Sequence, residues 1–165
     1  MNHYHRIFSL LPFVCLLVLF SGCGPGGPAL QYVEGVVTLD GKPVEDANIS
    51  FAPKQVLETD NDNGPLLAGG QTDANGRYKL STSLSTGIDK GTTVGEYVVT
   101  IVKKRVTNPP TGPGQQMGRP IFEYTVPRVF ENSDDSKITV TVVKGKNTFN
   151  FDLKSDGTFE VTNAK

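Results

Sequence analysis

The sequence of 165 residues predicts an all-β protein that folds as a single β-sandwich of about seven strands. Val and Thr occur 16 times each after Cys23, whereas Ala and Leu together occur 14 times, and β-branched residues favour strands. Apolar residues alternate at a period of two in several segments, and no window of about 11 residues has a helical period. Turn signals separate these segments, as in a sandwich.

The N-terminal residues 1–22 resemble a bacterial lipoprotein signal peptide. The uncharged apolar run Ile7–Phe20 suits the core of a signal peptide and is shorter than the about 20 residues of a membrane-spanning helix. Two small residues directly precede Cys23, as in a lipoprotein box. We expect lipid on the sulfur of Cys23, followed by a Gly/Pro-rich tether, so that residues 23–31 join a membrane to the domain. The alternative is an ordinary secretory signal peptide in which Cys23 has no such role.

Alternation then predicts the strands in order along the chain. The residues expected on the core-facing side are Val33, Gly35, Val37 and Leu39 in segment 33–39; Ala47, Ile49 and Phe51 in 47–51; Tyr78 and Leu80 in 78–80; Tyr97, Val99 and Ile101 in 95–103; Ile138, Val140 and Val142 in 138–142; and Phe149, Phe151 and Leu153 in 149–153. Because the segment 95–103 is apolar on both faces, we expect it to lie in the interior of its sheet.

Turn residues punctuate these segments. Asp40–Pro43 and Lys144–Asn147 form turns, and Asp73–Gly76 is a strong hairpin signal because Asn-Gly readily adopts positive φ. The segment Ile121–Val126 predicts a short edge strand.

The three long connections are Pro53–Leu66, Ser83–Val94 and Lys104–Ser136. If successive strands alternate in direction, the first two return to the end where the tether enters, and Lys104–Ser136 lies at the far end, as does Asp73–Gly76. As a random coil, the tether would span about 16 Å, which keeps its end of the domain close to the membrane.

Long connections often carry binding function, so the Pro/Gly-rich stretch 108–120 is the predicted contact surface. Its candidate partner-binding residues are Asn108, Pro109, Pro110, Gln115, Gln116 and Met117. The alternative is an insertion that binds nothing.

Composition excludes several kinds of site. The 16 basic and 17 acidic residues provide no basic field for nucleic acid. No His or Cys follows Cys23, which excludes Ser-His and Cys-His catalysis, His/Cys zinc sites and a disulfide in the processed chain. We therefore expect no catalytic residues, no cofactor and no metal.

Carboxylates leave two narrower possibilities open. Asp60–Gly64 is rich in oxygen ligands, but Pro65 and Gln71 occupy the positions where a calcium-binding EF-hand loop needs Gly and Glu. We therefore expect a solvated loop there rather than a calcium site. A pair of acids could support a carboxylate-based enzyme, although among 17 acids any chosen pair is more commonly surface.

Several motifs together resemble the carboxypeptidase regulatory-like domain, a transthyretin-like or immunoglobulin-like β-sandwich. These motifs are Val33–Val44 with Ala47–Phe51, then Thr72–Leu80 and Gly95–Ile101, and finally Lys144–Leu153, which resembles the closing hairpin of planctomycete lipoproteins that carry this domain alone. The resemblance covers residues 32–154 and leaves 155–165 as a C-terminal tail with room for a short extra strand. In that family the module is a non-catalytic appendage of peptidases and a repeat in surface or transport proteins. The histidines and the terminal Tyr-Arg-Gly-Ser of the related hydrolases are absent from the sequence.

These observations favour a non-enzymatic lipoprotein of the bacterial cell envelope, facing the periplasm or the cell surface. Its sandwich would be a structural or protein-binding module whose partners are the membrane, through Cys23, and an envelope protein. The alternatives are a module that binds carbohydrate or another small ligand and, less favoured, a carboxylate-based enzyme.

Overall fold

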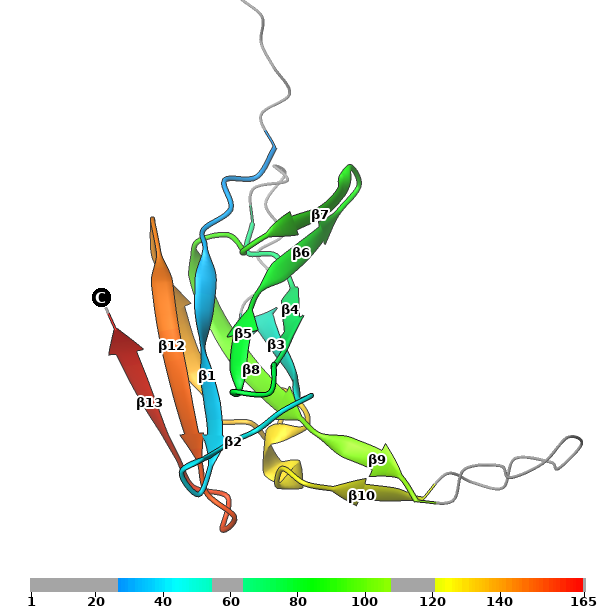
Figure 1. Cartoon of the computed structure of the whole chain (residues 1–165). Coiled ribbons are helices and arrows are strands. Elements are labelled where there is room, and N and C mark those ends of the chain that lie inside the picture. Colours follow the sequence, from blue (N-terminus) through cyan, green and yellow to red (C-terminus); the bar gives the residue numbers. More distant parts are fainter. Residues whose placement is uncertain (1–26, 55–63, 108–120, 165) are drawn as a thin grey trace, which may run out of the picture.

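The computed structural model describes residues 27–54, 64–107 and 121–164, which form two packed β-sheets and a projecting two-stranded arm (Figure 1). The strands are β1 (Val33–Leu39), β2 (Lys42–Pro43), β3 (Asn48–Pro53), β4 (Ala68–Gln71), β5 (Arg77–Lys79), β6 (Ser81–Leu84), β7 (Gly87–Lys90), β8 (Gly95–Val102), β9 (Lys104–Val106), β10 (Phe122–Tyr124), β11 (Thr139–Val142), β12 (Asn147–Leu153) and β13 (Phe159–Ala164). The one helical turn in this part of the chain is η1 (Arg128–Phe130).

The all-β sandwich is confirmed, but the described residues form thirteen strands instead of about seven. One sheet has the order β13-β12-β1-β2, with β5 also paired to β1. The other has the order β11-β8-β3-β4-β6-β7. Most of the additional strands have two to four residues, which is too short for alternation to reveal them.

The C-terminal residues 155–165, expected to be a tail with room for a short extra strand, do contain a strand. Strand β13 pairs along its whole length with β12, which lies parallel to β1. Phe159 and Val161 alternate along β13 and pack against the core. The sandwich therefore continues to the end of the described chain.

Strand β8 lies between β11 and β3, which confirms its predicted interior position. The predicted turn at Asp73–Gly76 also forms, and Gly76 has a φ of 71°. The hairpin prediction is wrong, however, because the flanking strands pair in different sheets: β4 with β3, and β5 with β1. The chain passes from β5 directly into β6, which returns to β4, so this turn joins the two sheets.

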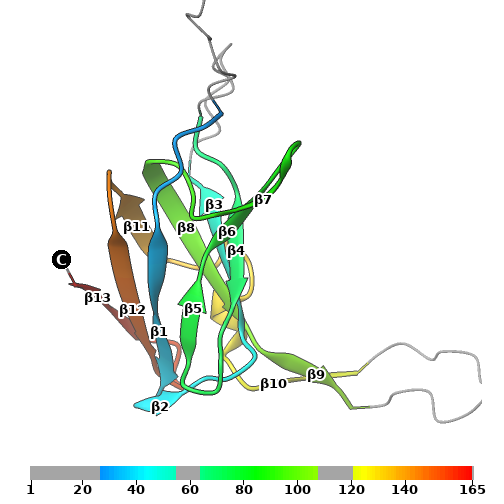
Figure 2. The same ribbon diagram turned by 45° about the horizontal axis from the view of Figure 1, so that its top comes forward.

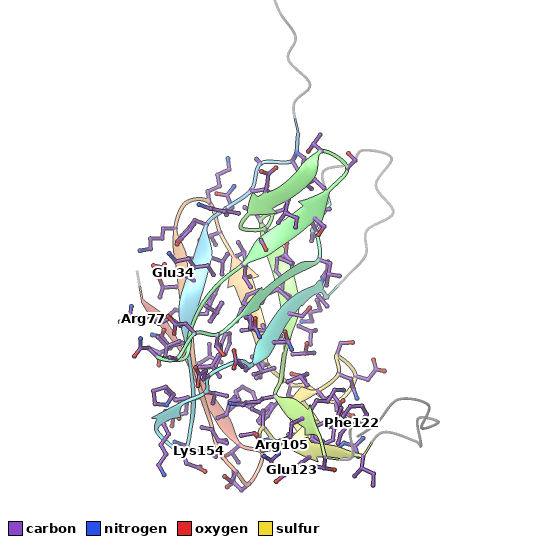
Figure 3. The ribbon with its side chains drawn as sticks, turned by 45° about the vertical axis from the view of Figure 1, so that its right-hand side comes forward. Glu34, Arg77, Arg105, Phe122, Glu123 and Lys154 are labelled. Atoms are coloured by element: carbon purple, nitrogen blue, oxygen red, sulfur yellow. The ribbon has the colours of Figure 1, made fainter. Side chains whose placement is uncertain are left out.

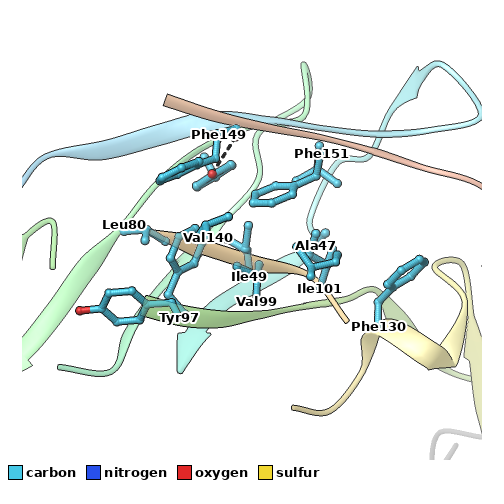
Figure 4. Packing of buried hydrophobic residues seen from close by; sticks show 14 of the residues in the cluster. Ala47, Ile49, Leu80, Tyr97, Val99, Ile101, Phe130, Val140, Phe149 and Phe151 are labelled. Atoms are coloured by element: carbon cyan, nitrogen blue, oxygen red, sulfur yellow. Dashed lines mark hydrogen bonds between the residues drawn. The ribbon is translucent and has the colours of Figure 1, made fainter. Parts of the chain in front are cut away.

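Aromatic rings fill the space between the sheets. The ring of Phe51 lies 6.0–6.4 Å from the rings of Tyr78, Tyr97, Phe149 and Phe151. Figure 4 shows Tyr97, Phe149 and Phe151 among the buried side chains. The predicted core-facing residues are all buried, except Leu39, which is half-buried and packs against the same cluster. The alternating faces were therefore predicted correctly.

The two ends of the sandwich differ, as the direction of the strands predicts. At one end, Gln31 in the tether forms a β-bridge with Thr92, just before β8 begins. At the other end, Val102 at the close of β8 pairs with Asn48, and the β9–β10 arm leaves from there (Figures 1 and 2). The arm, which is part of the connection Lys104–Ser136, therefore lies at the far end, as expected; residues 108–120 of that connection lie outside the described residues.

The segment Ile121–Val126 is not an edge strand of the sandwich. Its strand β10 pairs with β9 in a separate two-stranded sheet, because both segments lie beyond the last pairing of β8 with β3. The connection Ser83–Val94 contains a second projecting hairpin, β6–β7, at the tether end (Figure 2).

Candidate functional site

Several predicted site residues lie outside the described part of the chain. These are the lipidation residue Cys23, the oxygen-rich residues Asp60, Asn61, Asp62 and Asn63, and the candidate partner-loop residues Asn108, Pro109, Pro110, Gln115, Gln116 and Met117. The structure does describe the two strands that lead into and out of the predicted contact stretch.

These two strands, β9 and β10, form the arm at the far end of the sandwich. Phe122 pairs with Val106, Glu123 with Arg105, and Tyr124 with Lys104. Figure 3 shows Arg105, Phe122 and Glu123 on the arm, away from Glu34 and Arg77. Arg105 also donates to the Glu123 carboxylate at 2.7 Å, across the two strands.

Cations stack on aromatic rings along one side of the arm. The Lys104 Nζ lies 4.9 Å from the ring centre of Phe122 and 5.7 Å from that of Tyr124. The Arg128 guanidinium carbon lies 5.1 Å from the ring centre of Tyr124. These are cation–π distances, so the rings hold two positive charges at the surface.

Glu131 joins this cluster to the body of the protein. Its carboxylate accepts hydrogen bonds from Lys104 at 3.0 Å, Tyr124 at 3.1 Å and Arg128 at 3.4 Å. The hydrogen bond from Lys104, with smaller contributions from Tyr124 and Arg128, lowers the pKa of Glu131 below its ordinary value. The carboxylate is therefore ionised at neutral pH and anchors both cations.

The helical turn η1 fixes the position of the arm. Phe130 is buried, and its ring meets that of Phe159 on β13 edge-on, with centres 6.1 Å apart. Arg128 and Glu131, on either side of this anchor, reach back to the arm. The cluster is thus attached to the sandwich core.

The arm also exposes large apolar side chains. The four at this end of the molecule are Val106 (44% exposed), Ile121 (61%), Phe122 (41%) and Val129 (38%). Exposed apolar side chains that gather beside cations and aromatic rings are typical of a protein-binding surface. We define the arm surface as Lys104, Val106, Phe122 and Tyr124 on the arm, with Val129 in η1 at the same end of the molecule.

A shallow groove of about 520 Å³ lies on the outer side of β1 and β5. Polar and charged side chains line it, among them Glu34, Asp73, Arg77, Lys79 and Asn150. Such an open, polar groove can accept a hydrogen-bonding ligand such as a sugar.

The two acids in the groove already have structural partners. Lys146 lies 2.7 Å from Glu34, and its hydrogen bond, with that of Tyr32, lowers the pKa of Glu34. Asp73 accepts hydrogen bonds from two backbone amides of its own turn. The ionised Glu34 is unsuited to donate a proton at neutral pH, which disfavours carboxylate-pair catalysis in this groove.

Two further properties concern metals and membranes. Among the described residues, no three His, Cys, Asp or Glu side chains are grouped so that they could hold a metal ion. In the same part of the chain, no helix has the length and apolar character needed to cross a bilayer.

Sequence reasoning missed the arm surface, although a signal for it was present. Of the arm's two strands, one was expected as a short edge strand in Ile121–Val126, whereas the residues after Lys103 were expected to form a long connection. Val106 is the one apolar residue of Lys104–Val106, so alternation gives no signal for β9. The available signal is the Pro/Gly-rich stretch between Val106 and Ile121, because two extended segments around turn-forming residues predict a hairpin with a long loop.

Comparisons with models of protein families, with curated proteins and with solved structures find no match for this chain. The resemblance to the carboxypeptidase regulatory-like domain therefore stays a prediction that depends on the motifs themselves.

Proposed function

We propose that this chain is a non-enzymatic lipoprotein of the bacterial cell envelope. Lipid on Cys23 would hold it to a membrane, and its sandwich, of the carboxypeptidase regulatory-like type, would bind a protein partner through the arm surface. The observation that supports this most is the separation of the two ends. The tether enters at one end, and the cationic and apolar arm leaves from the other (Figure 1).

The length of the tether supports this orientation. Eight residue steps join Cys23 to Gln31, the tether residue that pairs with Thr92 of the sandwich, and they reach at most about 28 Å when fully extended. A lipid on Cys23 would therefore hold the tether end close to the headgroups. The arm would face away from that membrane, where a partner can reach it.

The chemistry of the arm indicates the kind of partner. Phe122 and Val106 offer apolar contact area, while Lys104 and Arg128 place positive charge beside it. The complementary surface is an apolar patch with acidic side chains at its rim. We therefore expect a protein partner rather than a nucleic acid or a cofactor.

Site-specific photo-crosslinking in the native envelope tests the arm. A photoreactive residue in place of Phe122 should capture one reproducible protein. A photoreactive residue in place of Ile88, which is also apolar and even more exposed but lies on the hairpin at the tether end, should not capture that protein. The double variant V106S/F122S should reduce capture from a neighbouring arm position at least tenfold. Identical capture from both ends would contradict the proposal.

The anchor has its own test. Cys23→Ser should prevent lipid attachment and leave the signal segment uncleaved, and the protein should lose its association with membranes. Mass spectrometry of the N-terminal peptide measures the lipid directly. A wild-type peptide without added lipid would contradict the anchor and leave the crosslinking result at the arm unaffected.

The groove favours a second candidate function, the binding of a carbohydrate or another small polar ligand. Thermal-shift measurements with wall and exopolysaccharide fragments test this, because a ligand that binds the folded state raises its melting temperature. Arg77→Gln, in the groove, should abolish such a shift, whereas Arg105→Gln, on the arm, should preserve it. No shift with any fragment would count against this candidate.

A further inference from the structure

The exposed large apolar residues of the described chain fall into two groups, one at each end. Four lie at the arm end, and the other four lie at the tether end. The second group is Leu67 (62% exposed), Ile88 (76%), Val94 (44%) and Val143 (56%). None of these four contributes to the arm surface, and three of them are more than half exposed.

Hydrogen bonds gather the segments that carry these residues around one tether residue, Gln31. The backbone N–H of Gln31 donates to Thr92 at 2.6 Å, and Thr92 donates back at 3.0 Å. The backbone N–H of Gly145 donates to the Gln31 side chain at 2.7 Å, which brings the turn after Val143 to the same place. Strand β7, which carries Ile88, leads directly into Gly91 and Thr92.

Leu67 and Val94 are held at this end by a pair of threonines. Thr92 Oγ1 donates to the Leu66 carbonyl at 2.8 Å, and the Leu66 N–H donates to Thr93 Oγ1 at 2.9 Å. The buried hydroxyl of Tyr97 donates to the Thr93 carbonyl at 2.8 Å. The segments before β4 and before β8 are therefore joined side by side, with Leu67 and Val94 exposed.

The turn that carries Val143 is equally well fixed. The side chain of Asn147 is buried, accepts from the Val143 N–H at 2.9 Å and donates to the Val143 carbonyl at 2.8 Å. These bonds hold the turn open toward solvent, and Val143 is 56% exposed. The exposure of Val143 therefore follows from the hydrogen bonds that fix this turn.

Lysines accompany the apolar group. Lys144 and Lys146 lie in the turn beside Val143, and Lys90 lies near Ile88 on β7. Lys146 pairs with Glu34, whereas Lys90 and Lys144 have no ion pair within the described residues. Asp89 is the one acid on β7. Basic side chains beside exposed apolar ones match an anionic headgroup layer above hydrocarbon.

We propose that the tether end is a lipid-contacting surface, with Leu67, Ile88, Val94 and Val143 entering the headgroup region and Lys90 and Lys144 meeting anionic headgroups. The inference deepens the proposed function and rests on lipid at Cys23. The lipid is at most about 28 Å of chain from Gln31, so this end is the part of the domain that meets the bilayer first. Contact at several points would fix the orientation of the sandwich, and the arm would point away from the membrane.

Tryptophan fluorescence tests the surface, since the chain contains no Trp. The lipidated protein is reconstituted into vesicles of phosphatidylcholine with about one-fifth phosphatidylglycerol, with or without bromine on the acyl chains. Ile88→Trp should give blue-shifted emission that brominated lipid quenches at least twofold. Val129→Trp, at the arm end of the molecule, should show neither effect. Val143→Trp is a second probe at the tether end, and circular dichroism confirms that each variant is folded.

The charge contribution has a matched test. Adding K90E/K144E to the Ile88→Trp variant should weaken the quenching of its tryptophan on anionic vesicles and change it little on vesicles of phosphatidylcholine alone. Adding Arg105→Glu instead, which removes an exposed cation at the other end, should have no effect.

The outcomes separate the lipid surface from the anchor. The protein can float with vesicles and carry lipid on Cys23 while quenching is equal at positions 88 and 129. That result would overturn the lipid surface and leave the anchor in place. A blue shift at position 88 that brominated lipid does not quench would mean that a second copy or another protein covers this end, which also overturns it. An unmodified Cys23 in protein that does not float would refute the anchor and, with it, the inference.

Discussion

The hydroxyl of Tyr78 is the clearest single test of how β5 and β12, the two neighbours of β1 in one sheet, are held together. It donates a hydrogen bond of 2.8 Å to the backbone carbonyl of Phe149, drawn as a dashed line in Figure 4. Tyr78 is 2% exposed, and burial raises the pKa of its phenol above the ordinary value. The hydroxyl therefore keeps its proton and remains a donor throughout the ordinary pH range. Tyr78→Phe removes this bond and keeps the ring.

The expected cost follows from what surrounds the carbonyl. A Cβ added to Gly35 would lie 1.8 Å from the Phe149 oxygen, so the backbone of β1 already covers that oxygen. No room remains there for a water molecule to replace the hydroxyl. A buried carbonyl left without its donor costs about 1–3 kcal/mol. At about 3 °C per kcal/mol for a domain of this size, the melting temperature should fall by about 3–9 °C.

Urea unfolding of the full chain measures this cost. Tyr78→Phe should lower the midpoint at an unchanged slope, because the surface exposed on unfolding stays the same. Tyr32→Phe is the matched control: its hydroxyl donates to Glu34 near the surface, and its loss should cost less than about 0.5 kcal/mol. Equal losses for the two variants would refute the reasoning, because they would show that the Phe149 carbonyl finds another donor.

Three further perturbations have definite expected outcomes. Gly35→Ala should cost about 3 kcal/mol in urea unfolding, since its Cβ would meet the Phe149 carbonyl, whereas Gly27→Ala, with no atom within 4 Å of its Cβ, should cost almost nothing. Phe51→Ala, at the centre of the ring cluster, should cost about 3–5 kcal/mol by the same assay. Because hydrogen bonding lowers the folded pKa of Glu131, its stabilisation is present above the unfolded value of about 4.3 and is lost as the pH falls through the folded value. The protection of β9 and β10 amides against hydrogen exchange, relative to the intrinsic rate at each pH, should therefore fall below about pH 4 in the wild type, and Glu131→Gln should lack that step.

Alternation predicted the core because a strand with one buried face has apolar residues at every second position. Val33, Val37, Tyr97 and Phe151 recur at a period of two, and each is at most 1% exposed. The pattern assigns a face to each residue, but it does not say which strands become neighbours. Gly35 shows the difference: it belongs to the buried face, and only the structure shows that β12 crosses close enough to exclude a Cβ.

The short strands could not be predicted because packing against the core does not select their side chains. Every residue of β7 and β9 is exposed, and these strands form through backbone pairing with β6 and β10. Because no residue of these two strands is buried, their sequences have no alternation of buried and exposed positions that would predict a strand. The same physical reason hid the arm surface, whose aromatic rings pack against cations instead of the core.

The two ends could be assigned even though the strand count was wrong, because the additional hairpins do not change the direction of the main strands. Strand β6 continues β5 through Leu80, and β9 continues β8 through Lys103, so neither reverses the chain. Strands β7 and β10 then bring the chain back to the end that it left, at Thr92 and Thr125 respectively. Each hairpin thus leaves and returns within one connection. The β9–β10 hairpin projects because neither strand pairs with the sandwich sheets, and β6–β7 projects because β6 meets β4 at a single pairing, Gly69 with Ser81. The hairpins β6–β7 and β9–β10 expose Ile88 and Phe122 to solvent, at opposite ends of the molecule. The features that sequence periodicity cannot detect are therefore the ones that supply both proposed contact surfaces.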